Sequence, residues 1–235
     1  MASYSLTASG QKMMKLDNEL KTNSTPMEAK RKGISIVGKY QFGPYKVVSG
    51  KAGWTTTKSS SKLFSFETRT ESDKKSSFVF IGDDQDSVIV NTLTNIRANE
   101  TVVGDMSTLN LSDNSYVAFI APEEDTTVWQ MNLFTRSGNE VEGNYHAEGI
   151  LTNGKSEIQI REVKQWEDGS NAFFELITGY EFYLDNQSIG AVQASIDTFK
   201  KKVVWLHKNL DNKMKLVLAA ASASLIIHVD DLISE

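Results

Sequence analysis

The chain has 235 residues, a formal net charge of −5 and no cysteine. Hydrophobic residues make up 40% of it and charged residues 23%, which is ordinary for a globular protein with a substantial core. The lack of cysteine excludes disulfides, thiol nucleophiles and thiolate metal sites. The negative charge gives no general attraction to nucleic acid, so we expect no nucleic-acid partner. His146, His207 and His228 are not spaced as a helical pair, and we expect neither a metal site nor a cofactor.

The first segment, residues 1–33, is polar and rich in Ser, Thr and Asn up to about Pro26. It contains one candidate helix, at residues 11–20, and its opening residues lack the apolar centre of a signal peptide. Its composition is similar to that of the tether that follows the lipidated cysteine of a bacterial lipoprotein, with Met1 in place of the cysteine. We therefore expect an N-terminal lipid anchor at the bacterial cell envelope, with a cytoplasmic protein as the alternative.

From residue 34 onward, short runs of β-branched and aromatic residues alternate with Gly, Asn, Asp and Ser, which is typical of strands and turns. No run indicates a crossover helix between parallel strands, so we predict a single antiparallel domain over residues 34–235. The predicted strands are residues 45–50, 62–70, 76–82, 87–93, 115–121, 127–136, 156–166, 172–179, 180–185, 189–195 and 201–208.

Residues 149–156, GILTNGKS, match the phosphate-loop pattern letter for letter. A phosphate loop needs a strand before it and a helix after it, so that backbone amides converge on phosphate. Here Ile158 and Ile160 follow in strand alternation, and Asn153-Gly154 is a strong hairpin signal. We therefore predict a hairpin with its turn at these two residues, and no nucleotide site.

A second motif, GDDQDS at residues 82–87, brings together Asp83, Asp84 and Asp86, whose oxygens are the ligands that calcium prefers. It lacks the glycine at the sixth position and the distal glutamate of an EF-hand loop. Because it lies between two predicted strands, we interpret it as a solvated hairpin turn. The segment PEEDTT at residues 122–127 has the same interpretation.

The most apolar stretch, KMKLVLAAASASLIIHV, spans residues 213–229 near the end of the chain. As a helix, residues 216–229 would be about 21 Å long. This is short of the roughly 30 Å of a bilayer core, so we expect no transmembrane helix. Apolar residues occupy every side of this helix, which predicts that it is buried all round, and Asn209 or Asp211 can cap its start.

The segments GYEFYLDNQSIGAVQ at residues 179–193 and KKVVWLHKNLDNKMKLVLAAASASLII at residues 201–227 resemble the end of tubby-like proteins. This group includes plant LURP-one-related proteins and phospholipid scramblases. The resemblance lies in the pattern of apolar positions over residues 180–227. It implies a mostly β fold, a single closed antiparallel barrel around a buried hydrophobic C-terminal helix. The alternative is a β-sandwich with a helix packed on its outside.

We expect a non-enzymatic binding or structural module. The best-known activity of the tubby proteins, phosphoinositide binding, depends on basic pocket residues that this chain does not match. A lipid or phosphoinositide-type binder is nevertheless an alternative, with Lys200, Lys201 and Lys202 as candidate ligand-binding residues. A hydrolase with dispersed carboxylates is a further alternative, although the chain contains no G-x-S-x-G nucleophile elbow.

Overall fold

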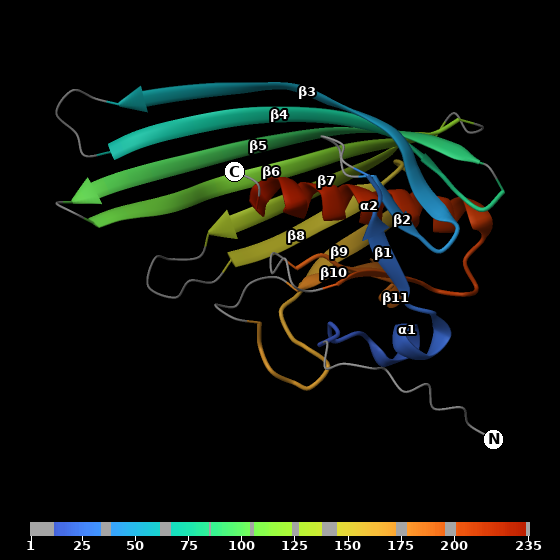
Figure 1. Cartoon of the computed structure of the whole chain (residues 1–235). Helices are drawn as coiled ribbons and strands as arrows, with labels where there is room; N and C mark the ends of the chain where they lie inside the picture. The colour runs from blue at the N-terminus through green and yellow to red at the C-terminus, as the bar shows by residue number, and fades with distance from the viewer. Residues whose placement is uncertain are drawn as a thin grey trace.

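The computed structural model describes residues 12–33, 39–61, 67–84, 86–103, 106–123, 127–137, 145–172, 178–195 and 201–233. In these residues, twelve strands form one closed antiparallel barrel, and a C-terminal helix packs against its strands from within (Figure 1). The prediction of a mostly β, closed antiparallel barrel is therefore confirmed, and the sandwich alternative was wrong.

The barrel is a meander in which each strand pairs with its neighbours in sequence, and β1 closes it by pairing with both β2 and β12. The helices are α1, Asn18–Asn23, and α2, Asn212–Ile233. The strands are β1 Met27–Arg31, β2 Tyr40–Phe42, β3 Tyr45–Ser61, β4 Glu67–Ile81, β5 Ser87–Val103, β6 Met106–Pro122, β7 Trp129–Ser137, β8 Tyr145–Thr152, β9 Glu157–Val163, β10 Gly179–Leu184, β11 Gln187–Gln193 and β12 Lys202–Leu206.

Four adjacent strands, β3 to β6, are 15 to 17 residues long and project beyond the shorter strands (Figure 1). The sequence predicted only parts of them, and residues 51–61, 94–103 and 106–114 were not predicted as strands. These segments are rich in Ser, Thr, Asn and charged residues, so they lack the apolar alternation of a half-buried strand. Residues 62–66 and 173–177 of two predicted strands lie outside the described residues.

Helix α2 is buried along most of its length, as predicted. Every residue from 216 to 229 is buried, and Ala219, Ala220 and Ala221 have no exposed surface. These residues share one core with inward-facing strand residues such as Phe80 and Ile120. The Asp211 side chain accepts a hydrogen bond from the Met214 amide at 2.7 Å, so Asp211 is the N-cap. No helix in the described residues is both long and apolar enough to span a membrane.

The predicted hairpin at residues 146–163 is confirmed, with β8 and β9 as its strands. Its loop has four residues, 153–156, and only Gly154 of the predicted turn pair has a positive φ, of 81°. The Asn153 side chain accepts hydrogen bonds from the Lys155 and Ser156 amides at 3.0 and 2.8 Å. The helix that a phosphate loop needs is therefore replaced by a strand.

The acidic turn predicted at residues 82–87 joins β4 to β5, and in it the Gly82 amide donates a hydrogen bond to the Asp86 carbonyl at 2.9 Å.

A two-residue turn with both residues at positive φ occurs elsewhere, at Asp185 and Asn186, between β10 and β11. Their φ angles of 50° and 65° are those of a type I′ turn.

The packing of α2 generates a stability prediction. Ala220→Trp should destabilise the fold by about 3 kcal/mol or more, because the new ring has no space between the helix and the strands. Lys213→Trp, in the exposed first turn of the same helix, should change the stability by about 0.5 kcal/mol or less. Urea unfolding followed by circular dichroism measures both variants, and equal effects would contradict the enclosure of α2.

Candidate functional site

Residues 12–24 lie on the outside of the barrel, against β10 to β12. Met14 forms an isolated β-bridge with Trp166, and Ser24 forms one with His207. The described part of segment 1–33 is therefore packed on the barrel and supplies its strand β1, and its helix is at residues 18–23 instead of 11–20. An outer apolar cluster holds it in place, formed by Met14, Leu20, Ala191, Val203 and Trp205.

Gly179, at the start of β10, is where this segment approaches the barrel most closely. A Cβ atom at Gly179 would lie 2.5 Å from the Met14 sulfur and 2.1 Å from the Val192 carbonyl oxygen, so only glycine fits. The Met14 amide also donates to the Gln193 side-chain oxygen at 2.8 Å. In turn, the Gln193 side chain donates to the Lys201 carbonyl at 2.8 Å, which links the segment to β11 and β12.

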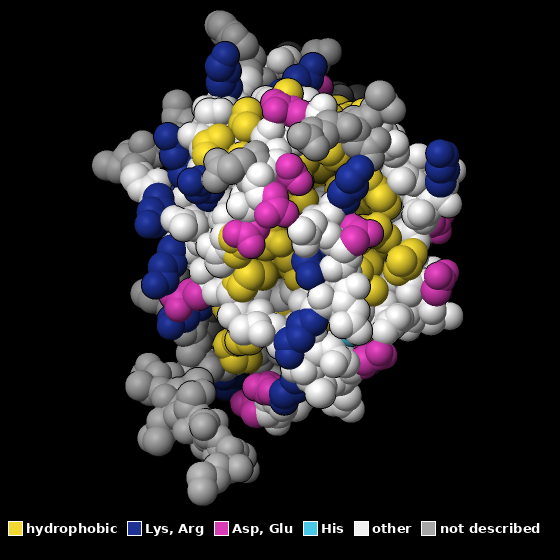
Figure 2. All heavy atoms as spheres, turned by 90° about the vertical axis from the view of Figure 1, so that its right-hand side faces the viewer, with side chains coloured by type: hydrophobic (Ala, Val, Ile, Leu, Met, Phe, Trp, Pro, Cys, Tyr) yellow, Lys and Arg dark blue, Asp and Glu magenta, His cyan; other side chains and the backbone are white. Residues whose placement is uncertain are grey.

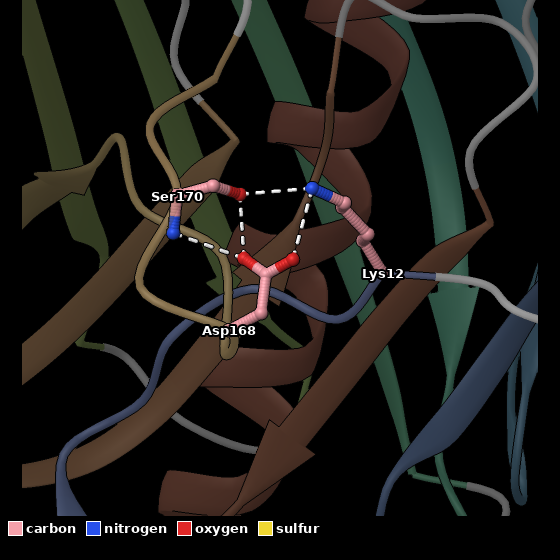
Figure 3. Close-up of polar contacts among 3 residues, drawn as sticks. All are labelled: Lys12, Asp168 and Ser170. Atoms are coloured by element: carbon pink, nitrogen blue, oxygen red, sulfur yellow. Dashed lines mark hydrogen bonds and ion pairs between the residues drawn. The ribbon is translucent and has the colours of Figure 1, made fainter.

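A polar cluster fastens the start of the segment to the loop after β9 (Figure 3). Lys12 Nζ lies 2.9 Å from an Asp168 carboxylate oxygen and donates to the Ser170 hydroxyl at 2.9 Å. The Ser170 amide and hydroxyl donate to the other Asp168 oxygen at 2.9 and 2.5 Å. These hydrogen bonds from Ser170 and Lys12 hold the pKa of Asp168 well below its usual range.

Between this segment and strands β9 and β10 lies a cavity of about 720 Å³, which we call the outer groove. It is larger than two cavities at the end of the barrel where α2 begins, of about 410 and 270 Å³. Its walls come from residues 15–18 of the segment, from residues 162–165 and 171, and from β10. The segment thus forms one wall of the groove.

Glu181 of β10 lies against the groove and is buried. Its two carboxylate oxygens accept hydrogen bonds from the Asp17 amide at 2.8 Å, the Tyr183 hydroxyl at 2.7 Å and the Ser188 hydroxyl at 3.3 Å. Burial raises the pKa of Tyr183 and the hydrogen bond to Glu181 raises it further, so Tyr183 stays protonated. Because both oxygens are engaged by protein donors, Glu181 is poorly placed to act as a general base.

The other charged side chains of the groove also have partners within it or beside it. Lys15 Nζ donates to the Gln165 side-chain oxygen at 2.9 Å, and Lys164 lies 3.3 Å from a Glu162 oxygen. The Arg161 guanidinium lies 4.3 Å from the centre of the Tyr183 ring. Side-chain amides at Asn18, Gln165 and Asn171 complete the lining. The groove therefore presents a hydrogen-bonding surface with charges of both signs, from two lysines (Lys15 and Lys164) and three carboxylates (Asp17, Glu162 and Glu181).

The candidate lysines are not brought together on one surface. Lys201 points outward and lies 3.2 Å from Glu28 of β1. Lys202 points inward, where it pairs with Asp230 of α2 and lies 5.6 Å from the centre of the Tyr40 ring. Burial lowers the pKa of Lys202 to about 8, and the nearby Arg31 also lowers it. Lys200 lies outside the described residues.

The pairing of Lys202 is part of a charged cluster at the C-terminal end of α2. Asp230 and Asp231 lie in the last turn of the helix, where the helix dipole disfavours negative charge. The ion pair with Lys202 offsets the charge of Asp230, and Lys74 Nζ of β4 lies 3.3 Å from a carboxylate oxygen of Asp231. The two aspartates directly follow the apolar stretch, and the sequence analysis did not assign them a role.

His228, one turn earlier, stacks on Tyr116 of β6 with 4.2 Å between the ring centres. The Tyr116 hydroxyl donates to the Ser224 carbonyl at 3.0 Å. His228 is buried, and its Nδ1 atom has no hydrogen-bond partner among the described residues. Burial lowers the pKa of His228 to about 4, and the charge of Lys74 also lowers it.

The acidic turn lies at the opposite end of the barrel, where α2 begins. Figure 2 shows this end, with acidic side chains next to hydrophobic ones near the middle of the face. Asp84 accepts a hydrogen bond from the Asn212 side chain at 2.9 Å, which ties the turn to the helix. Asp83, Asp84 and Asp86 line the 410 Å³ cavity, but the described residues contain no group of His, Asp and Glu arranged to hold a metal ion.

Comparison of the chain with protein-family models, with curated proteins and with solved structures gives no match in any of the three. The closed barrel with its C-terminal helix is consistent with the tubby-like fold.

The burial of His228 predicts a pH dependence of stability. Its pKa in the folded chain, about 4, lies below the value of about 6.5 in the unfolded chain, so the unfolded chain binds more protons between these values. This residue should therefore cost about 3 kcal/mol of stability as the pH falls from 6.5 to below 4. Urea unfolding at several pH values measures the effect, and His228→Leu, which keeps every carboxylate, should lose this part of the slope. Identical slopes for the two proteins would contradict the prediction.

Proposed function

We propose that the protein is a non-enzymatic binding module with a tubby-like fold, and that it binds its ligand in the outer groove. The observation that carries this proposal is the burial of α2 residues 216–229 inside the barrel. Barrels that bind small ligands keep an open interior for them, and here the helix takes that space. The outer groove, at about 720 Å³, is within the usual size of a ligand site.

The lining of the groove supports a neutral ligand with many hydrogen-bonding groups. Lys15 and Lys164 have partners in the groove, and Glu181 accepts three hydrogen bonds from the protein. A charged ligand would have to displace these contacts, whereas a neutral one can use the side-chain amide of Asn18 and the amide nitrogen of Asn171, whose oxygen accepts a hydrogen bond from Gln165. A short saccharide has this chemistry, and we take it as the ligand class.

An array of neutral oligosaccharides, read by biolayer interferometry, tests the proposal. The double variant Asn18→Ala, Asn171→Ala should bind about tenfold or more weakly, since each lost hydrogen bond costs about 1 kcal/mol. Asn209→Ala removes the same kind of amide at an exposed position outside the groove and should bind as the unchanged protein does. Failure of the unchanged protein to bind any oligosaccharide, or equal losses in both variants, would refute the proposal.

The same preparation discriminates the alternatives. If the protein is a hydrolase, a bound oligosaccharide will be recovered cleaved, whereas a binding module returns it intact. If the protein binds phosphoinositides through Lys201, it will co-sediment with vesicles that contain phosphoinositides, and the Lys201→Ala variant will stay in the supernatant. We expect no sedimentation, because the pairing of Lys201 with Glu28 and of Lys202 with Asp230 offsets their charges.

We also propose that the protein works at the bacterial cell envelope, held by a lipid on its N-terminal side. The polar, Ser- and Thr-rich composition that precedes the packed residues supports this location. Membrane fractionation and intact-mass measurement of the native gene product provide the test. We expect a membrane-bound product carrying the added mass of a lipid, and a soluble product without added mass would place the protein in the cytoplasm instead.

A further inference from the structure

A second candidate ligand site lies at the end of the barrel where α2 begins. It is the cavity of about 410 Å³, which we call the mouth cavity, and none of its lining residues belongs to the outer groove. Its volume is within the usual range for a small-molecule site. The mouth cavity is therefore separate from the proposed saccharide site, and its ligand can be argued on its own.

Part of the lining of the mouth cavity is apolar. The apolar side chains are Met27 of β1, Pro44 between β2 and β3, Leu206 of β12 and Leu216 of α2. Figure 2 shows hydrophobic side chains among acidic and basic ones at this end of the barrel. Removing apolar surface from water is favourable, so a ligand with an apolar body suits this lining better than a wholly polar one.

One wall of the mouth cavity is acidic. Asp83, Asp84 and Asp86 belong to the turn between β4 and β5, and none of them forms an ion pair within the described residues. The neutral side-chain amide of Asn212 donates to Asp84 at 2.9 Å and leaves its charge uncompensated. These carboxylates match an organic ammonium group, which can donate up to three hydrogen bonds.

The Tyr45 hydroxyl is a second polar group on the acidic side. The Tyr45 side chain is only 8% exposed, and its ring stacks on Phe80 with 6.1 Å between the ring centres. Its hydroxyl has no hydrogen-bond partner among the described residues, and Tyr45 lines the mouth cavity. Burial raises the pKa of Tyr45, and the charges of Asp83 and Asp84 raise it further. A nearly buried hydroxyl without a partner is unusual in proteins, and it points to a ligand that completes it.

The mouth cavity also has a basic side. Lys208 and Lys215 line it, and neither forms an ion pair within the described residues. The sheet order β12-β1-β2-β3-β4 places three strands between Lys208, just after β12, and the acidic turn. Unpaired positive and negative charges therefore lie on separate walls of one cavity.

We propose that the mouth cavity binds a zwitterion with an apolar body, which is the chemistry of an apolar amino acid or a short apolar peptide. The ammonium group of the ligand contacts Asp83 and the Tyr45 hydroxyl. Its carboxylate contacts Lys208 and Lys215, and its apolar body packs on Leu216. A purely cationic ligand would be repelled by the two lysines, and a purely anionic one by the three carboxylates.

Isothermal titration calorimetry on the full chain tests the ligand class, with leucine and leucyl-leucine as the probes. We expect at least one of them to bind with a dissociation constant below about 1 mM. Acetylation of its amine and amidation of its carboxylate should each weaken binding about tenfold or more, because each removes a charge-assisted contact. Failure of both probes to bind would overturn the proposal. If amidation changes nothing, the ligand is an amphipathic amine and the zwitterion is wrong.

Two double variants test which wall binds which end of the ligand. Asp83→Asn with Asp84→Asn should remove most of the effect of acetylation and keep the effect of amidation. Lys208→Gln with Lys215→Gln should do the reverse. As a matched control, Asp185→Asn with Lys155→Gln makes the same charge changes in exposed turns outside the cavity and should bind every derivative as the unchanged chain does. Equal losses in all three double variants would overturn the assignment of the walls.

Tyr45→Phe tests the unpartnered hydroxyl. The ring and its packing on Phe80 are kept, and the hydroxyl that is lost has no partner within the described residues. The variant should therefore bind the probe about threefold to tenfold more weakly and unfold within about 2 °C of the unchanged chain. A lower unfolding temperature with unchanged binding would show that the hydroxyl is structural. Asn18→Ala with Asn171→Ala, in the outer groove, should leave binding of the probe unchanged, which separates this site from the saccharide site.

Discussion

The enclosure of α2, which is buried on every side from residue 216 to residue 229, is the constraint on which the rest of this structure depends. A helix satisfies its own backbone hydrogen bonds, so α2 can lie among strands without leaving unpaired polar groups. The small alanines at its centre share one core with large inward side chains such as Phe80 and Phe182, and this difference in size allows close packing. The strands in turn need an apolar body inside the barrel, because their inward faces have no other partner. With that space occupied, any ligand has to bind on the outside.

The features that could be predicted from sequence are those with a local pattern. An apolar run without a polar stripe predicted α2, and Asn153-Gly154 between two alternating runs predicted the β8–β9 hairpin. The projecting parts of β3 to β6 could not be predicted, because their Ser- and Thr-rich residues show no apolar alternation. Strand β1 was also missed, because its partner in the sheet, β12, lies at the other end of the chain.

The outer groove could not be predicted from the sequence either, because its residues are far apart in the chain. Its walls come from residues 15–18, from residues 162–165 and 171, and from β10, so no short motif contains them. Within its own strand, Glu181 has the pattern of an ordinary outward residue, and only the packed N-terminal segment turns it into a buried acceptor. The three lysines were adjacent in sequence, but strand alternation sends Lys201 and Lys202 to opposite faces.

The position of α2 after all twelve strands has a consequence for the order in which the barrel can fold. All twelve strands leave the ribosome before α2, the helix that fills the barrel, and β1 must wait for β12 before the barrel can close. Such non-local pairing is slow, and until α2 arrives the inward faces of the strands remain uncovered. A chain that stops short of α2 therefore has every strand and still lacks its core.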